Sequence, residues 1–327
     1  MKVMLRGYIA RRLLMTVPML LLISFLTFSM MHLAPGGLSA VFIGARVRLE
    51  EDRIAIMRHY GLDQPFHIRY FRWLGRVLEG DFGYSLRFRR PALDMIVERI
   101  PATLQLTIPS ILVSVAVAIP VGVLSALRQY SVADNLATVG AFLFVSTPSF
   151  FLGIVAILIF SVGLGWLPIS GMSTFGLRDP TTLTLIVDRL RHLVIPGGIV
   201  LGLGYTAGLL RYVRGSMLDV LRQEYIRTAR AKGLSERVVI YKHALRNSLL
   251  PVVTILGMWV PYILGGSMIA EVISAWPGMG RLAVDAVFGR DYPLVMGTLL
   301  LAASMTLVGN LLADVSYSLL DPRIRYE

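Results

Sequence analysis

The sequence predicts an all-α integral membrane protein with six transmembrane helices. Of its 327 residues, 55% are hydrophobic and only 16% are charged, whereas soluble domains carry about 25% charged residues. The apolar residues also gather in long runs without charge and without the polar–apolar alternation of a membrane β-barrel. There is no cysteine, which excludes a disulfide scaffold, thiolate metal sites and cysteine nucleophiles.

Each predicted span is a charge-free run close to the roughly 20 residues that a helix needs to cross a bilayer. The first covers residues 13–31. The other five are residues 101–127, 136–162, 193–210, 248–270 and 293–313. A cleaved signal peptide is the alternative for the first run, because a basic segment precedes it. The run is longer than the apolar region of a signal peptide, and no small-residue cleavage site follows, so we expect a retained anchor.

The Lys and Arg residues predict the orientation of the spans. The segments predicted to be cytoplasmic are residues 1–12, the turn at Arg128, the loop 211–247 and the tail 314–327. They hold sixteen of the 32 basic residues, whereas the short outside loops 163–192 and 271–292 hold three and two. Both termini are therefore expected in the cytoplasm. The net charge of +12 then reflects topology, and no nucleic-acid partner is expected.

Residues 32–100 form the one sizeable segment between spans, and we expect it to be helical and extracytoplasmic. A helix is predicted over 49–60, and another begins at Pro65 with Tyr70 and Trp73 on an aromatic face. A turn follows at 80–83, and a short helix after Pro91 leads into the second span. About 69 residues are too few for an independent enzyme domain. We expect the aromatic face to pack on the membrane domain.

The cytoplasmic loop 211–247 contains nine basic residues. Met217, Leu218, Leu221 and Tyr225 recur at helical spacing, which predicts that a helix continues from the fourth span. Gly233 suits a helix C-terminus because it adopts left-handed φ without strain. Ser235 would cap a following helix. The pattern leaves two interpretations open: a patch that binds anionic lipid, or a lever that docks into a cytosolic partner.

No motif in the chain indicates catalysis. No G-x-x-x-x-G-K-[ST] loop is present, so we expect no ATP hydrolysis by this chain, and no H-E-x-x-H or G-x-S-x-G motif occurs. The six spans contain no Asp, Glu, Lys or Arg, which argues against a proton- or sodium-coupled carrier. We expect most polar residues in the spans to bond to neighbouring helices. The candidates for lining a polar pathway are Gln105, Ser146, Ser149 and Asn310.

The loop also carries a recognisable pattern. Residues 224–234 read EYIRTARAKGL and residues 242–247 read KHALRN, which resembles the coupling loop of ABC importer permeases, and specifically the first permease subunit of the dipeptide/oligopeptide/nickel class. The general permease pattern is matched only at Ala229, Gly233 and Leu245. Further landmarks of the narrower class are RRLL at 11–14, LAPG at 33–36, YGLDQP at 60–65, GDFGYS at 80–85, RIPATL at 99–104, WLP at 166–168, Glu271, WPGMG at 276–280, RDYP at 290–293 and DPRIR at 321–325.

The resemblance implies the transmembrane domain of a type I ABC importer in a bacterial inner membrane. It also implies a second permease subunit, two cytosolic ATPases and an extracytoplasmic binding protein as partners. ATP and Mg would be used by the ATPases, and this chain would hold no cofactor. The residues that the resemblance assigns to ATPase coupling are Glu224, Arg227, Thr228, Ala229, Arg230, Ala231, Lys232, Gly233, Leu234 and His243, with the coupling helix expected over 227–234.

The function implied by the resemblance is import of peptides. Nickel, glutathione or another small solute is the alternative within the same class. Two alternatives come from other classes: a self-sufficient secondary carrier or channel, and a membrane scaffold without transport. The charge-free spans argue against the carrier, and the coupling-loop pattern argues against both.

Overall fold

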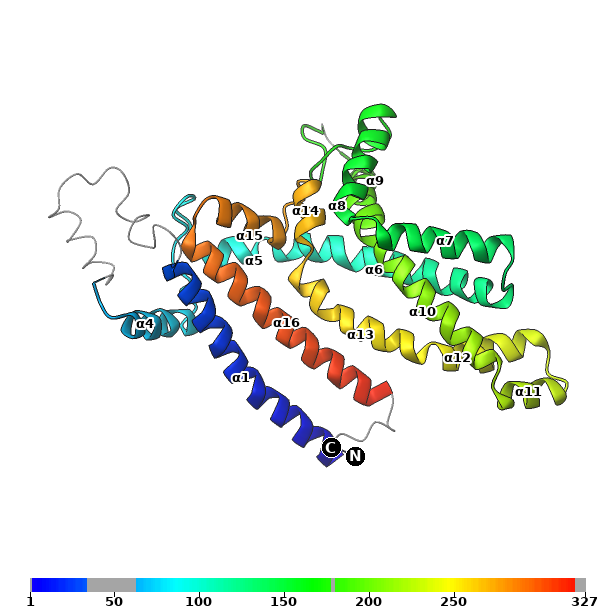
Figure 1. The fold of residues 1–327 in the computed structure, drawn as a ribbon. Coiled ribbons are helices and arrows are strands. Elements are labelled where there is room, and N and C mark those ends of the chain that lie inside the picture. Colours follow the sequence, from blue (N-terminus) through cyan, green and yellow to red (C-terminus); the bar gives the residue numbers. More distant parts are fainter. Residues whose placement is uncertain (1, 34–62, 178–179, 321–327) are drawn as a thin grey trace.

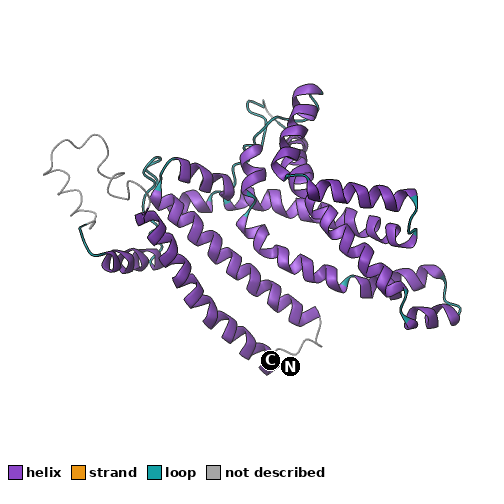
Figure 2. Ribbon diagram, viewed as in Figure 1, coloured by secondary structure: helices purple, strands orange, loops and turns teal. Residues whose placement is uncertain are grey.

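The computed structural model describes residues 2–33, 63–177 and 180–320, which form helices joined by loops, without a β-strand among them (Figures 1 and 2). The N-terminal helices are α1 (Lys2–Leu33), α4 (Phe66–Leu78), α5 (Ala92–Val97) and α6 (Ile100–Leu127). The central ones are α7 (Val132–Ser146), α8 (Ser149–Ala156), η1 (Ile157–Gly163), α9 (Thr182–Leu193), η2 (Val194–Gly202) and α10 (Leu203–Leu221). The C-terminal ones are α11 (Glu224–Ala231), η3 (Val238–Ala244), α12 (Leu245–Ser248), α13 (Leu250–Gly265), α14 (Met268–Ile273), α15 (Met279–Phe288) and α16 (Tyr292–Leu320).

Length and apolar composition give between four and six candidate membrane spans in the described residues. Four helical stretches qualify individually: Leu14–Leu33, Ala92–Leu127, Thr182–Leu221 and Tyr292–Ala313. Two bent pairs raise the number to six if each pair is one span: Val132–Ser146 with Ser149–Gly163, and Val238–Ser248 with Leu250–Ile263. All six predicted charge-free runs therefore coincide with helical segments, but two of them are not single straight helices.

The predicted third span, 136–162, is sharply broken. The helices α7 and α8 meet at 103° across Thr147 and Pro148. Thr147 is extended, with φ −89° and ψ 129°, because a residue that precedes proline is disfavoured in the helical region. Pro148 then starts α8 as its N-cap. The proline explains the break, while the packing of α7 against α10 and of α8 against η2 fixes the direction of each helix.

The predicted fourth and fifth spans also differ from the structure. The fourth, 193–210, lies inside a longer helical stretch that runs from Thr182 to Leu221 through the π-helical turn η2, which contains Pro196. The fifth, 248–270, ends early at Gly265, and Gly266 with φ +75° separates α13 from α14. A positive φ is accessible to glycine without a Cβ clash, so the chain changes direction there.

The aromatic face predicted after Pro65 packs against the first predicted span, as expected. Phe28 of α1 and Trp73 of α4 have ring centroids 5.3 Å apart, and Ser24 Oγ lies 2.8 Å from the Tyr70 hydroxyl. Helix α16 lies beside α1 along its length (Figure 1). The turn at 80–83 is present, with positive φ at Gly80 and Gly83. The helix predicted over 49–60 lies outside the described residues.

Helices α6 and α10 form the centre of the largest buried cluster, which includes Val213 and Met217 of α10. Several hydroxyl groups of α6 bond to neighbouring segments, as the sequence predicts for polar residues within spans. The Ser114 hydroxyl donates to the Gly202 carbonyl at 3.0 Å, and the Thr107 hydroxyl donates to the Ile263 carbonyl at 3.1 Å. The cluster also includes Ile226, so it extends from α10 to α11.

Candidate coupling site

The loop 211–247 contains a short helix, α11, between two changes of chain direction. Helix α10 ends at Leu221, and Gln223 is extended at the start of α11. The predicted continuation of one helix as far as Tyr225 is therefore wrong. Glu224 lies in the first turn of α11 and Arg230 in its last turn, where their charges complement the helix dipole. The structure places the helix at Glu224–Ala231, three residues before the predicted range 227–234.

Gly233 forms the turn that ends this helical segment. Its φ is +73°, as the sequence predicts for a helix C-terminus. The Gly233 N–H donates to the Arg230 carbonyl at 2.9 Å, and the Leu234 N–H donates to the Ala229 carbonyl at 3.4 Å. A Cβ added at Gly233 would meet nothing within 4 Å. The turn is therefore open on its outer side.

One face of α11 is anchored to the helices of the predicted spans. Ile226 is fully buried and Ala229 nearly so, and both belong to the cluster that includes Met217, Val239 and Ala244. Burying a side chain of isoleucine size contributes about 1.5–3 kcal/mol. Met217 lies on α10, which precedes α11, and Val239 lies on η3, which follows it. Helix α11 therefore packs against both of the segments that it connects. A force on α11 is thus transmitted to α10.

The opposite face of α11 is exposed and polar. Of the ten residues assigned to coupling, eight are exposed: Glu224, Arg227, Thr228, Arg230, Ala231, Lys232, Gly233 and Leu234. Arg227 Nη1 lies 2.9 Å from Glu224 Oε1. Arg230 Nε lies 2.8 Å from Glu236 Oε1. Exposed ion pairs of this kind contribute little to stability, so these charges remain available to a partner.

The remaining two of the ten assigned residues are not on the exposed face of α11. Ala229 faces the core, and His243 is half-buried in η3. The His243 carbonyl accepts a hydrogen bond from Asn247 Nδ2 at 3.3 Å, and the same amide donates to the Tyr225 hydroxyl at 2.8 Å. Asn247 thereby ties α11 to α12. Tyr225 and Asn247 both lie inside the recognised pattern but were not predicted as site residues.

Comparison with known proteins identifies the family. Residues 118–326 match the family described as binding-protein-dependent transport system inner membrane component, and residues 4–107 match the corresponding N-terminal family. The chain belongs to this family of ABC importer permeases. It is 44% identical over 98% of its length to the oligopeptide transport system permease protein AppB of Bacillus subtilis, covering 99% of that protein.

Two further relatives are similar over nearly their whole length. The permease is 39% identical to the dipeptide transport system permease protein DppB of Escherichia coli, with 98% of this chain and 99% of the relative aligned. It is 38% identical to the glutathione transport system permease protein GsiC of Salmonella typhimurium, again with 98% and 99% aligned. The family resemblance stated from the coupling-loop pattern is confirmed.

A buried ion pair of the permease joins α7 to α10 and was not predicted. Arg214 of α10 donates to Asp134 of α7 through Nε at 2.6 Å and Nη2 at 2.8 Å. The Asp134 carboxylate also accepts from the Ser125 hydroxyl and from the Tyr130 N–H, the latter at 2.8 Å. A signal existed in the sequence, because Ser131-x-x-Asp134 has capping-box spacing, and the Ser131 hydroxyl accepts from the Asp134 N–H at 3.2 Å.

A second buried carboxylate lies one residue beyond the predicted fifth span. Glu271 is fully buried and accepts hydrogen bonds from the Thr103 hydroxyl at 2.9 Å and the Arg281 N–H at 3.0 Å. Thr103 also accepts from the Met279 N–H at 2.8 Å. Burial raises the pKa of Glu271 above its ordinary value, and the hydrogen bonds from Arg281 and Thr103 offset only part of this rise. The network joins α6, α14 and α15, and only the motif containing Glu271 indicated it beforehand.

The four predicted pathway residues are not gathered at one place. Gln105 is exposed on α6 and Ser146 is exposed at the end of α7, while Ser149 on α8 and Asn310 on α16 are half-buried. Among the described residues, no hydrogen bond links any two of them. The described residues also contain no group of three or more histidine or acidic side chains placed to hold a metal ion. A pathway assignment for these four stays a prediction.

Proposed function

We propose that the permease is the first membrane subunit of an ATP-driven peptide importer and that α11 with Gly233 is its ATPase-coupling element. The observation that carries this proposal is the two-sided character of α11. Ile226 and Ala229 anchor it to the core of the predicted spans, while Arg227, Arg230 and the open turn at Gly233 face outward. Such a helix can receive a partner and pass on the partner's movement.

The proposed assembly contains a second permease subunit, two cytosolic ATPases and an extracytoplasmic binding protein. Closure of the ATPase dimer on ATP would displace α11. Because α11 shares a buried cluster with α10, and α10 is tied to α7 by the Arg214–Asp134 pair, these helices would move together. Rigid-body rocking of this kind supports alternating access of the pathway to the two sides of the membrane.

The proposed topology has six spans, both termini in the cytoplasm and residues 32–100 outside. The distribution of basic residues supports it, as does the position of α4 and α11 at opposite ends of the molecule (Figure 1). The chain has no cysteine, so Leu78→Cys and Lys232→Cys each create a single labelling site. An impermeant maleimide should label Leu78→Cys in intact cells and Lys232→Cys only after permeabilisation. The reverse pattern would refute the orientation.

Peptides are the proposed substrate class because the relatives are named as permeases for oligopeptides, dipeptides and glutathione. Glutathione is itself a tripeptide, so all three names fall in one chemical class. The measurement is uptake of labelled di-, tri- and pentapeptides by cells that contain the full transporter. Absence of uptake for all three would refute the peptide assignment.

The coupling assignment is tested by Gly233→Asp. Aspartate tolerates left-handed φ better than most residues, and a Cβ at this position has open space around it, so the fold should persist. The added carboxylate and bulk should block ATPase docking and abolish uptake, with normal membrane insertion. Gly176→Asp is the matched control, because Gly176 is also exposed, has φ +78° and offers an added Cβ nothing within 4 Å. Normal uptake by Gly233→Asp would refute the assignment.

The rival classes give different results in reconstituted vesicles. A self-sufficient carrier or channel would transport peptide with this chain alone. A scaffold would bind the ATPases without substrate-stimulated ATP hydrolysis. The proposed importer subunit requires the second permease, the ATPases and the binding protein together, and ATP hydrolysis should rise when peptide-loaded binding protein is added.

A further inference from the structure

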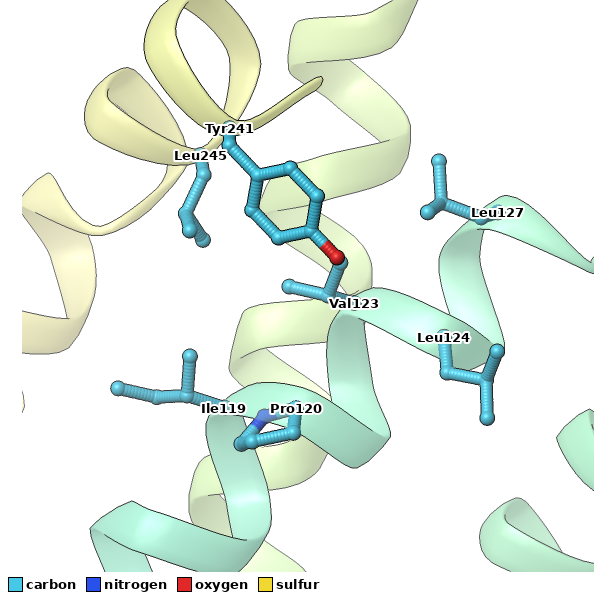
Figure 3. Close-up of a pocket in the computed structure, with 7 residues that line it drawn as sticks. All are labelled: Ile119, Pro120, Val123, Leu124, Leu127, Tyr241 and Leu245. Carbon is cyan, nitrogen blue, oxygen red and sulfur yellow. The ribbon is translucent and has the colours of Figure 1, made fainter. Parts of the chain in front are cut away.

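An apolar pocket lies between the end of α6 and the coupling segment, and the function proposed above does not use it. It has a volume of about 390 Å³, which is within the range of small-molecule pockets. Its lining residues are Ile119, Pro120, Val123, Leu124, Leu127, Tyr241 and Leu245. Figure 3 shows Tyr241 reaching from η3 toward α6, with its hydroxyl toward Val123. The side chains on both walls are therefore apolar, apart from the phenolic oxygen of Tyr241.

The pocket is open to the surroundings of the chain. Leu124 is 44% exposed, Leu127 is 38% exposed and Tyr241 is 61% exposed. The pocket lies at the end of an apolar run, because its lining residue Leu127 is the last residue of α6 and Arg128 follows. With the proposed topology, on which this inference rests, the pocket lies where the inner half of the bilayer meets the cytoplasm.

Basic residues directly follow pocket-lining residues in the sequence on both walls. Arg128 follows Leu127, Lys242 follows Tyr241 and Arg246 follows Leu245, and all three basic residues are exposed. None of them forms an ion pair with another described residue. A nearby acid, Asp134, is already paired with Arg214. An apolar pocket whose lining residues are followed in sequence by exposed basic residues suits a ligand with an acyl chain and an anionic head.

We infer that this pocket binds an anionic phospholipid of the inner leaflet, with its acyl chain between α6 and η3 and its phosphate beside Arg128, Lys242 and Arg246. Anionic lipid attracts basic side chains at the cytoplasmic surface. A second protein chain seated here would have to bury those three charges, which is unfavourable unless each is paired. The lipid headgroup pairs them while they stay hydrated.

The site would connect lipid composition with coupling. Tyr241 and Leu245 belong to η3 and α12, which follow the Gly233 turn, and Val239 of η3 packs in the same cluster as Ile226 of α11. A lipid between η3 and α6 therefore lies within one layer of side chains of the coupling helix. It would brace the coupling segment against α6.

The test places a tryptophan in the pocket of the assembled transporter. Tyr241→Trp is reconstituted in mixtures of phosphatidylglycerol and phosphatidylcholine, with bromine on the acyl chains of one lipid at a time, and bromine quenching of the new tryptophan is measured. We expect brominated phosphatidylglycerol to be favoured at least about fivefold, roughly the factor that one basic side chain contributes at an anionic surface. Leu127→Trp, on the other wall, gives a second reporter.

The basic residues are tested with a matched pair of triple variants in the reporter background. Arg128→Ala/Lys242→Ala/Arg246→Ala should bring the preference for phosphatidylglycerol to about one. Arg72→Ala/Arg76→Ala/Arg87→Ala removes the same charge from exposed positions elsewhere and should leave the preference unchanged. An equal loss of the phosphatidylglycerol preference in both triple variants would refute the site, because it would indicate a general surface-charge effect.

Two other results would also overturn the inference. Equal quenching by the two brominated lipids would show that no headgroup is selected. Absence of quenching by either lipid at both reporters would show that protein, such as the second permease, covers the pocket. The measurement needs no transport, so it is independent of the Gly233→Asp test: a phosphatidylglycerol preference together with normal uptake by Gly233→Asp would refute the coupling assignment and leave the lipid site standing.

Discussion

The ion pair between Asp134 and Arg214 should be a main determinant of the stability of the permease. The Asp134 side chain is 2% exposed and that of Arg214 is 23% exposed, and two parallel hydrogen bonds of 2.6 and 2.8 Å join them. Arg214→Ala leaves the carboxylate buried, with the Ser125 hydroxyl, the Tyr130 N–H and, at 3.4 Å, the Thr138 hydroxyl as its remaining donors. Breaking a buried pair costs about 3–5 kcal/mol. We expect about 3 kcal/mol, at the low end of this range, because the remaining donors still stabilise the charge.

The assay is unfolding of the purified chain by SDS in mixed micelles, followed by tryptophan fluorescence. Asp134→Ala/Arg214→Ala should be less destabilised than the sum of the two single variants, with a coupling energy of about 2 kcal/mol. Arg214→Lys should fall between wild type and Arg214→Ala, because lysine keeps the charge but loses the planar two-pronged contact. Arg227→Ala is the control, since its pair with Glu224 is exposed, and it should change stability by less than about 0.5 kcal/mol.

Either of two results would refute this reasoning. A loss below about 1 kcal/mol for Arg214→Ala would mean that water or a rearranged side chain satisfies the carboxylate, so that the pair is not buried in the folded chain. Strict additivity of the two single variants would mean that Asp134 and Arg214 do not interact energetically. In both cases the proposed rigid connection between α7 and α10 would lose its support.

Three further predictions concern other contacts. Ile226→Ala should lower the unfolding free energy by about 2–4 kcal/mol by emptying the core contact of α11, and trypsin should then cleave faster at the exposed arginines of that helix. Thr103→Val should cost about 1–3 kcal/mol, measured in the same SDS titration, since Glu271 loses a hydroxyl donor in a buried site. Gly309→Ala should cost about 1–3 kcal/mol because its Cβ would lie 2.8 Å from the backbone of α13. Gly204→Ala, with nothing within 4 Å, should be neutral or stabilising.

Several local features were accessible from sequence because each depends on a few neighbouring residues. Gly233 adopts the left-handed φ that its place after a helix predicts. Pro65 and Pro101 mark helix starts, as expected from their restricted φ. The end of α10 at Leu221 was missed, because the helical spacing of apolar residues continues to Tyr225 across a change of direction.

Contacts between distant segments were not accessible in the same way. Asp134 and Arg214 are 80 positions apart, and Thr103 and Glu271 are 168 positions apart. Each of these residues alone fits an ordinary role at the end of an apolar run. Only the packing of α7 against α10, and of α15 against both α6 and α14, brings the partners within hydrogen-bonding distance.

The sequence by itself determined the class of protein, because the separation of apolar runs from basic loops is a property of the chain alone, and the ordered motifs determined the family. The tertiary structure decided how the runs are used. It bends one predicted span by 103° at Pro148 and interrupts another at Gly266. It also forms the apolar pocket between α6 and the segments η3 and α12. The physical reason is that the mean hydropathy of a membrane-length stretch depends only on the residues along the chain. Bends, buried pairs and pockets depend on which helix faces meet.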